Sequence, residues 1–178
     1  KNQYTVQDVP AQYKSGNPYF EWYISKEQSQ FQFEIGYTAT EAVHVYEDTA
    51  EFYWQPIAAE NGFPVDSVTI RVHIPEGSGV TTEDILVWGH GPLQGEVAVN
   101  SPTLATWTVK NIQPGDFVDV RLALPVSLFP EAPRFDGEKL AAILTEEQNL
   151  ADTANAERAR SRFLIAGPFL AIFLLIIM

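Results

Sequence analysis

Cysteine is absent from this sequence of 178 residues. Its absence excludes disulfide scaffolds, zinc sites built from thiolates, iron–sulfur clusters and cysteine nucleophiles. Basic residues are scarce, because 11 Lys and Arg stand against 23 Asp and Glu, for a formal net charge of −12. Binding to nucleic acid normally needs a positively charged surface, so this balance argues against a nucleic-acid partner. Hydrophobic residues make up 46% of the chain, which is enough to build a core.

Familiar catalytic and metal-binding motifs are missing as well. The histidines His44, His73 and His90 are far apart and form no H-x-H or H-E-x-x-H spacing. No serine lies in a G-x-S-x-G turn, and no glycine-rich segment ends in the Gly-Lys-Ser/Thr of a phosphate-binding loop. His90 stands between two glycines, and we expect a plain turn there because no nucleophile or metal set accompanies it. We therefore expect neither an enzyme nor a bound cofactor.

Acidic residues are densest at Glu47, Asp48 and Glu51. Carboxylate oxygens of this kind suit Ca²⁺, but the spacing fits no calcium-loop pattern. We favour a solvated acidic edge over a metal site, with these three residues as the Ca²⁺ candidate. In the same segment Phe52 and Trp54 lie two residues apart on one face of a strand, and we expect both in the core.

Alternating apolar residues predict β-strands in the first 135 residues. The alternation is clearest at 30–37, 68–74 and 117–124. In the last of these strands, Asp119 and Arg121 are expected to face solvent. Weaker candidates are 20–24, 43–46, 50–54, 85–88, 96–99 and 105–109. Because Gly- and Pro-rich turns separate these short strands, the sequence predicts an antiparallel, immunoglobulin-like β-sandwich over 1–135.

Helix-forming sequence follows the predicted strands. From Glu138 to Arg162 there is neither Gly nor Pro, and Asp136 can serve as the N-cap. These features predict a helical stalk over 136–162, which can lean on the sandwich or on a neighbouring helix.

The final segment, 163–178, contains no charged or polar side chain. A buried C-terminal helix is one interpretation, and a transmembrane helix whose far end lies beyond this sequence is the other. We predict the membrane span, because the segment is apolar all round although slightly shorter than the usual length of about 20 residues. The expected anchor residues are Phe163, Leu164, Ile165, Phe169, Leu170, Phe173, Leu174 and Leu175.

The side of the membrane that holds the β domain stays open on these residues alone. Arg158, Arg160 and Arg162 precede the apolar segment, and the positive-inside rule would place that flank in the cytoplasm. A large domain behind a signal sequence, however, can cross the membrane largely regardless of nearby charge. The sequence starts at Lys1 without a leader, and we expect a signal sequence and further residues in the full protein.

Several segments resemble a known family. The aromatic-rich segment 46–54 is the most specific, and further similarity lies at 64–75, 88–93, 113–125 and 143–158. From about residue 20 onward the chain is similar to bacterial and archaeal predicted membrane proteins that carry the domain of unknown function 2207. The resemblance implies a signal peptide, an extracytoplasmic β region and later transmembrane helices, which would place this domain outside the cell membrane. It implies no catalytic residue, because the family has no established activity.

Two hypotheses of function remain. The first is a membrane-anchored interaction or structural module, a subunit of a membrane assembly that contacts the lipid bilayer and a protein partner or a second copy of itself. The alternative is an enzyme that acts on envelope glycans or peptides with paired carboxylates as acid and base. Nothing in the sequence pairs two carboxylates, so we favour the interaction module.

Overall fold

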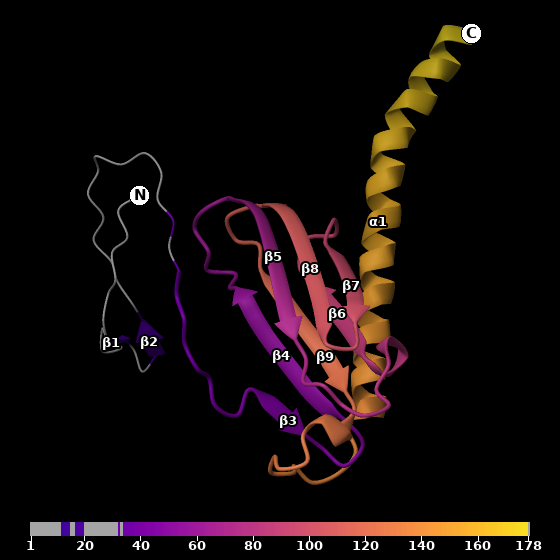
Figure 1. Ribbon diagram of the computed structural model, residues 1–178. Coiled ribbons are helices and arrows are strands. Elements are labelled where there is room, and N and C mark those ends of the chain that lie inside the picture. Colours follow the sequence, from indigo (N-terminus) through magenta and orange to yellow (C-terminus); the bar gives the residue numbers. More distant parts are fainter. Residues whose placement is uncertain (1–11, 15–16, 20–31, 33, 178) are drawn as a thin grey trace. The chain divides into compact units, whose positions relative to one another are not determined.

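The computed structural model describes residues 12–14, 17–19, 32 and 34–177, and it describes side chains for 32 and 34–160 (Figure 1). The chain divides into two units, Lys1–Thr38 and Ala39–Met178. In the first unit, β1 (Gln12–Lys14) pairs antiparallel with β2 (Asn17–Tyr19).

The strand predicted at 30–37 is wrong in its described part. Residues 34–37 form no strand, and Ile35 and Tyr37 are 56% and 68% exposed. Alternation alone cannot make a strand, because the side chains also need a partner strand and a face to pack against. The strand predicted at 20–24 lies outside the described residues.

The second unit contains two antiparallel sheets (Figure 1). The four-stranded sheet has the order β3-β4-β9-β6, and the three-stranded sheet has the order β5-β8-β7. The strands are β3 (Val43–Val45), β4 (Ala50–Ile57), β5 (Val65–His73), β6 (Leu86–His90), β7 (Glu96–Ser101), β8 (Leu104–Ile112) and β9 (Val118–Leu124). The strands predicted between 43 and 124 are thus confirmed. Short 3₁₀ helices lie between β5 and β6, at Thr82–Asp84, and after β9, at Val126–Leu128.

The inner faces of the two sheets share one hydrophobic core. Trp107 comes from β8 and Leu122 from β9, and both are almost fully buried in the same cluster. Phe52 and Trp54 pack against this cluster from β4, as predicted, with their rings stacked and the centroids 6.2 Å apart. A smaller cluster at one end of the sheets is centred on Ile112.

The strand order differs from that of an immunoglobulin constant domain. In that domain, the second strand pairs with the fifth and the sixth pairs with the seventh. Here, counting from β3, the second strand β4 pairs with the seventh, β9, while the fifth, β7, pairs with the sixth, β8. The mostly β class with antiparallel sheets is confirmed, and the immunoglobulin-like order is not.

Helix α1 (Leu140–Ile177) follows the sheets and confirms the helix predicted in this part of the chain, although it begins at residue 140 and not at 136. The predicted N-cap is wrong, because the carboxylate at the helix start comes from Asp48 and not from Asp136. Asp48 accepts hydrogen bonds from the backbone N–H groups of Lys139, at 2.8 Å, and Leu140, at 3.0 Å. A carboxylate there satisfies free N–H donors and complements the helix dipole.

The predicted membrane anchor falls on the last part of α1. The helix backbone continues to Ile177, but the side chains of 161–178 lie outside those that the structure describes. Among the described residues, no helical stretch is both long enough and apolar enough to cross a membrane. The anchor at 163–178 therefore stays a prediction.

Candidate functional site

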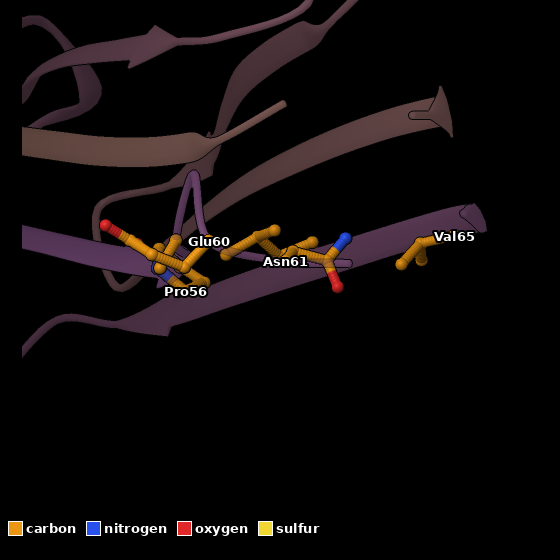
Figure 2. A pocket seen from close by; sticks show the side chains of 6 residues that line it. Pro56, Glu60, Asn61 and Val65 are labelled. Atoms are coloured by element: carbon orange, nitrogen blue, oxygen red, sulfur yellow. The ribbon is translucent and has the colours of Figure 1, made fainter. Parts of the chain in front are cut away.

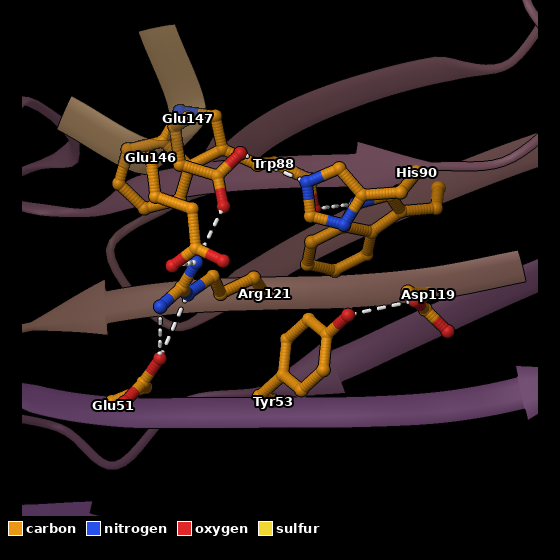
Figure 3. Close-up of polar contacts among 9 residues, drawn as sticks. Glu51, Tyr53, Trp88, His90, Asp119, Arg121, Glu146 and Glu147 are labelled. Carbon is orange, nitrogen blue, oxygen red and sulfur yellow. Dashed lines mark hydrogen bonds and ion pairs between the residues drawn. The ribbon is translucent and has the colours of Figure 1, made fainter. Parts of the chain in front are cut away.

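A cluster of polar side chains lies between the outer face of the four-stranded sheet and α1 (Figure 3). We call it the Arg121 cluster. Its members are Glu51, Tyr53, His90, Asp119, Arg121, Glu146 and Glu147. Strand register explains the grouping: Tyr53 lies directly opposite Arg121, and His90 lies opposite Asp119. These side chains project from the face opposite the hydrophobic core.

Arg121 is the centre of the cluster and is only 5% exposed. Its Nε donates to Glu51 Oε1 at 2.7 Å, and its Nη1 donates to Glu146 Oε2 at 2.9 Å and to Glu147 Oε1 at 2.8 Å. Burial acts to lower the pKa of Arg121, but the hydrogen bonds to Glu146, Glu147 and Glu51 outweigh it and raise this pKa. The guanidinium is thus a permanent charge that joins β9 to β4 and to α1.

The solvent-facing positions predicted for Asp119 and Arg121 are wrong. Every residue of β9 is buried, because the core covers one face of the strand and α1 covers the other. Ile143 of α1 is fully buried, and Glu147 follows it one turn later on the same side of the helix. Alternation correctly separated the two faces of β9, but it could not reveal that a distant helix covers the polar one.

Glu147 bridges two strands from its position on α1. One carboxylate oxygen binds Arg121, and the other lies 2.8 Å from His90 Nε2. Burial acts to raise the pKa of Glu147, but the hydrogen bonds from His90 and Arg121 outweigh it and hold this pKa below its ordinary value. Glu147 is therefore ionised at neutral pH, although only 4% of its side chain is exposed.

Tyr53 and Asp119 form a second contact within the cluster. The Tyr53 hydroxyl donates to Asp119 Oδ2 at 2.7 Å, and the Arg121 guanidinium lies 5.5 Å from the Tyr53 ring centroid. Burial and the hydrogen bond to Asp119 raise the pKa of Tyr53 to about 12. The other oxygen, Asp119 Oδ1, is buried and has no hydrogen-bond partner within the described part of the protein.

The glycines on either side of His90 are required by close packing. A Cβ on Gly89 would lie 2.9 Å from the Trp107 side chain, and Gly91 has φ +131° and a Cβ added there would collide with the Phe117 carbonyl oxygen. His90 itself is the last residue of β6, and the turn begins after it. The plain turn predicted at His90 is therefore wrong, since the histidine is a paired strand residue.

The charge of the cluster is unbalanced. Three carboxylates (Glu51, Glu146 and Glu147) bind one arginine, and a fourth, Asp119, binds Tyr53, so the carboxyl groups outnumber the guanidinium. Buried charges of this kind are tolerated only when they are paired and hydrogen-bonded. The cluster therefore holds α1 against the sheet in one position, because displacement of the helix would leave Glu147 without its partners and Arg121 with Glu51 alone.

Of the three residues proposed for Ca²⁺, Asp48 and Glu51 bind other groups, and Glu47 contributes its backbone N–H to a bond with the Gly137 carbonyl oxygen. Asp48 caps α1, and Glu51 binds Arg121. Across the residues that the structure describes, no group of three or more His, Asp or Glu side chains fits a metal ion. A separate surface pocket, of about 250 Å³, is lined by Pro56, Ile57, Ala58, Glu60, Asn61 and Val65 (Figure 2).

Comparison with known proteins identifies one family. A family model described as "Predicted membrane protein (DUF2207) N-terminal domain" matches residues 1–124. The match includes both sheets and ends with β9, so Glu51 and Arg121 lie inside it, whereas Glu146 and Glu147 follow it. No curated protein and no solved structure matches the chain.

Proposed function

This chain belongs to the family of predicted membrane proteins that carry the DUF2207 N-terminal domain, and from that membership we propose that it is a membrane-anchored interaction or structural module. In this proposal the β domain lies on the extracytoplasmic side. The Arg121 cluster fastens it to the helix that continues into the anchor.

The observation that carries the proposal is the continuity of α1. The helix that supplies Glu147 to the cluster runs without a break from Leu140 to Ile177 and so includes residues 163–177 of the apolar segment. A continuous helix transmits position and orientation along its length, because each residue adds a fixed rise of about 1.5 Å. Fastening α1 to the sheet would therefore set the orientation of the β domain above the membrane.

Several contacts besides the ion pairs support this fastening. Asp48 binds the first N–H groups of α1, and Ile143 is buried one turn before Glu147. Further along, Arg158 Nη2 donates to the carbonyl oxygen of Leu93 at 3.0 Å. Contacts at residues 139–147 and again at residue 158 fit a domain held in one orientation for a protein partner or a second copy.

The same cluster gives little support to an envelope-acting hydrolase. A glycosidase needs two carboxylates that reach the substrate at a defined separation. Glu51 and Glu147 do approach one another, but both are buried and both bind Arg121. Carboxylates held in this way are suited to fastening a helix.

Membrane anchoring by 163–178 is tested by flotation of the 178-residue chain with vesicles after an alkaline wash, so that no later membrane helix contributes. We expect the unaltered protein to float and the double variant Leu170→Arg/Phe173→Arg to stay in the soluble fraction, since each arginine costs about 2.5–3.5 kcal/mol at the centre of a membrane helix. Leu150→Arg, at a position 44% exposed on α1, is the matched control and should float. Flotation of the double variant would contradict the anchor.

The side of the membrane and the partner need separate measurements. Because the chain has no cysteine, Ser78→Cys provides a single thiol on an exposed loop. A membrane-impermeant maleimide should label it in intact cells, and labelling only after lysis would contradict the extracytoplasmic position.

Purification in mild detergent should yield a stoichiometric protein partner or a dimer, and a lone monomer would contradict the interaction module.

A further inference from the structure

Three loops meet at the end of the β domain where β4 ends and β9 begins. The pairs Ile57↔Val118 and His90↔Asp119 in one sheet, together with Val65↔Ile112 in the other, bring the loops 58–64, 91–95 and 113–117 to this end. Each loop exposes one large apolar side chain: Phe63 is 77% exposed, Phe117 37% and Leu93 36%. We call these three residues the apolar tip.

Hydrogen bonds with the Asn61 side chain fix the backbone of Phe63, whose own side chain is exposed. The Asn61 side chain donates to the Phe63 carbonyl oxygen at 2.6 Å and accepts from the Phe63 N–H. The Asn61 carbonyl oxygen in turn accepts from the N–H of Gly115, at 3.0 Å, which ties two of the loops together. A large apolar side chain fixed in water loses the stabilisation that burial would give, so a group of them indicates a contact surface.

Helix α1 reaches the same end of the domain. It starts at the opposite end, where Asp48 precedes β4, and Arg158 contacts the carbonyl oxygen of Leu93 in the tip. The apolar segment begins at residue 163, five residues later, which corresponds to roughly 8 Å along a helix. Each polar layer of a bilayer is about 5–8 Å thick, so the tip lies near the depth of the lipid headgroups if 163–178 spans the membrane.

We propose that the apolar tip inserts into the headgroup layer of the bilayer in which the chain is anchored. The proposal rests on the membrane anchor of the proposed function and adds a second lipid contact to it. Glu60 and Asp66 are exposed beside Phe63, which makes a zwitterionic surface a better match than an anionic one. At the opposite end, the exposed Phe135 ring already contacts the rings of His44 and Tyr46.

A single fluorescent label tests the insertion while Phe63 stays in place. Gly62→Cys is suitable because a Cβ at this position meets no atom within 4 Å, and the chain contains no other thiol. The full-length protein is labelled with an environment-sensitive fluorophore and reconstituted into phosphatidylcholine vesicles with and without brominated lipid. Ser78→Cys, on the loop that follows β5 at the opposite end, is the matched control.

The label at position 62 should show blue-shifted emission and lose intensity in brominated vesicles, whereas the label at 78 should behave as in water. Adding Phe63→Asp should abolish both effects at position 62. Emission at 62 like that at 78 would overturn the insertion, and so would a blue shift without bromine quenching, which would indicate a protein contact. Flotation of the same samples reports the anchor separately, so loss of flotation identifies a failure of the proposed function instead.

Discussion

The two faces of β9, in the four-stranded sheet, are both buried, but by different chemistry. The inner face packs Phe52, Val120 and Leu122 into an apolar core shared with the second sheet. The outer face places Arg121 among carboxylates beneath α1. Apolar contacts tolerate small shifts, whereas a buried ion pair stabilises only the arrangement in which every charge is paired. The core thus holds the sheets together, and the ionic face determines where the helix lies.

Removal of the central charge should have the largest effect on the outer face. Arg121→Met leaves Glu51 and Glu147 buried without their partner, and we expect the free energy of unfolding to fall by about 3–5 kcal/mol. Urea denaturation measures this loss. Arg71→Met, at an exposed position on β5, is the matched control and should change stability by no more than about 0.5 kcal/mol. Equal losses in the two variants would contradict the central role of Arg121.

Glu146 and Glu147 of α1 both bind Arg121, but only Glu147 is buried, so replacing each of them should reduce stability by a different amount. Glu147→Ala deprives both His90 and Arg121 of an acceptor and should cost about 2 kcal/mol. Glu146→Ala removes a bond to the same Nη1 atom, but 59% of the Glu146 side chain is exposed, so its loss should stay below about 1 kcal/mol. The reverse order in denaturation experiments would show that Glu146 is the dominant contact.

Acid should weaken the contact between α1 and the four-stranded sheet, because it protonates Glu147. Its folded pKa lies below the ordinary value of 4.5, so the stabilisation is present above that value and is lost as the pH falls through the lowered pKa. Between about pH 6 and about pH 3, the stability difference between the unaltered protein and Glu147→Gln should shrink, by at most about 1.4 kcal/mol per pH unit. A difference that stays constant over this range would contradict the assignment.

The two candidate caps of α1 should differ in their contribution to stability. Asp48→Ala removes the acceptor for Lys139 and Leu140 and should cost about 1 kcal/mol. Asp136→Ala, at the cap position that the sequence suggests, should have almost no effect. Thermal unfolding followed by circular dichroism compares the two variants, and a larger loss for Asp136→Ala would restore the local cap.

The smallest expected effect concerns Tyr53. Its pKa of about 12 means that the folded protein favours the neutral phenol. The contribution of this phenol to folding stability is therefore present below pH 10 and is lost as the pH rises through about 12. Absorbance titration should show a late component that ionises near pH 12, and Tyr53→Phe should remove that component. A late component that persists in the variant would assign it to another tyrosine.

Apolar alternation predicted the strands well, but it did not predict that α1 buries the polar side of β9. Alternation located β5 and β9 and placed Phe52 and Trp54 against the core, because a strand with one apolar face carries that information in its own residues. It failed at 34–37, where apolar alternation has no partner strand in the described structure.

The Arg121 cluster could not be predicted because its contacts are distant in sequence. Arg121 meets Glu51 across 70 positions, and Asp48 caps a helix that starts 92 positions later. One signal was present: Asp119 and Arg121 are the only charged residues in the otherwise apolar segment 118–124. A charged pair within a buried strand indicates a covering element with complementary charge, and Glu146-Glu147 supplies that complement.

Hydrogen–deuterium exchange of the full-length protein tests most directly whether the Arg121 cluster fastens α1 to the sheet. The amides of residues 140–158 are compared in the unaltered protein and in Arg121→Met, with the β5-β8-β7 sheet as the internal reference. We predict that exchange of the helix accelerates in the variant while that sheet keeps its protection. Unchanged protection of the helix would contradict the fastening, and equal acceleration of helix and sheet would show that Arg121 supports the whole domain.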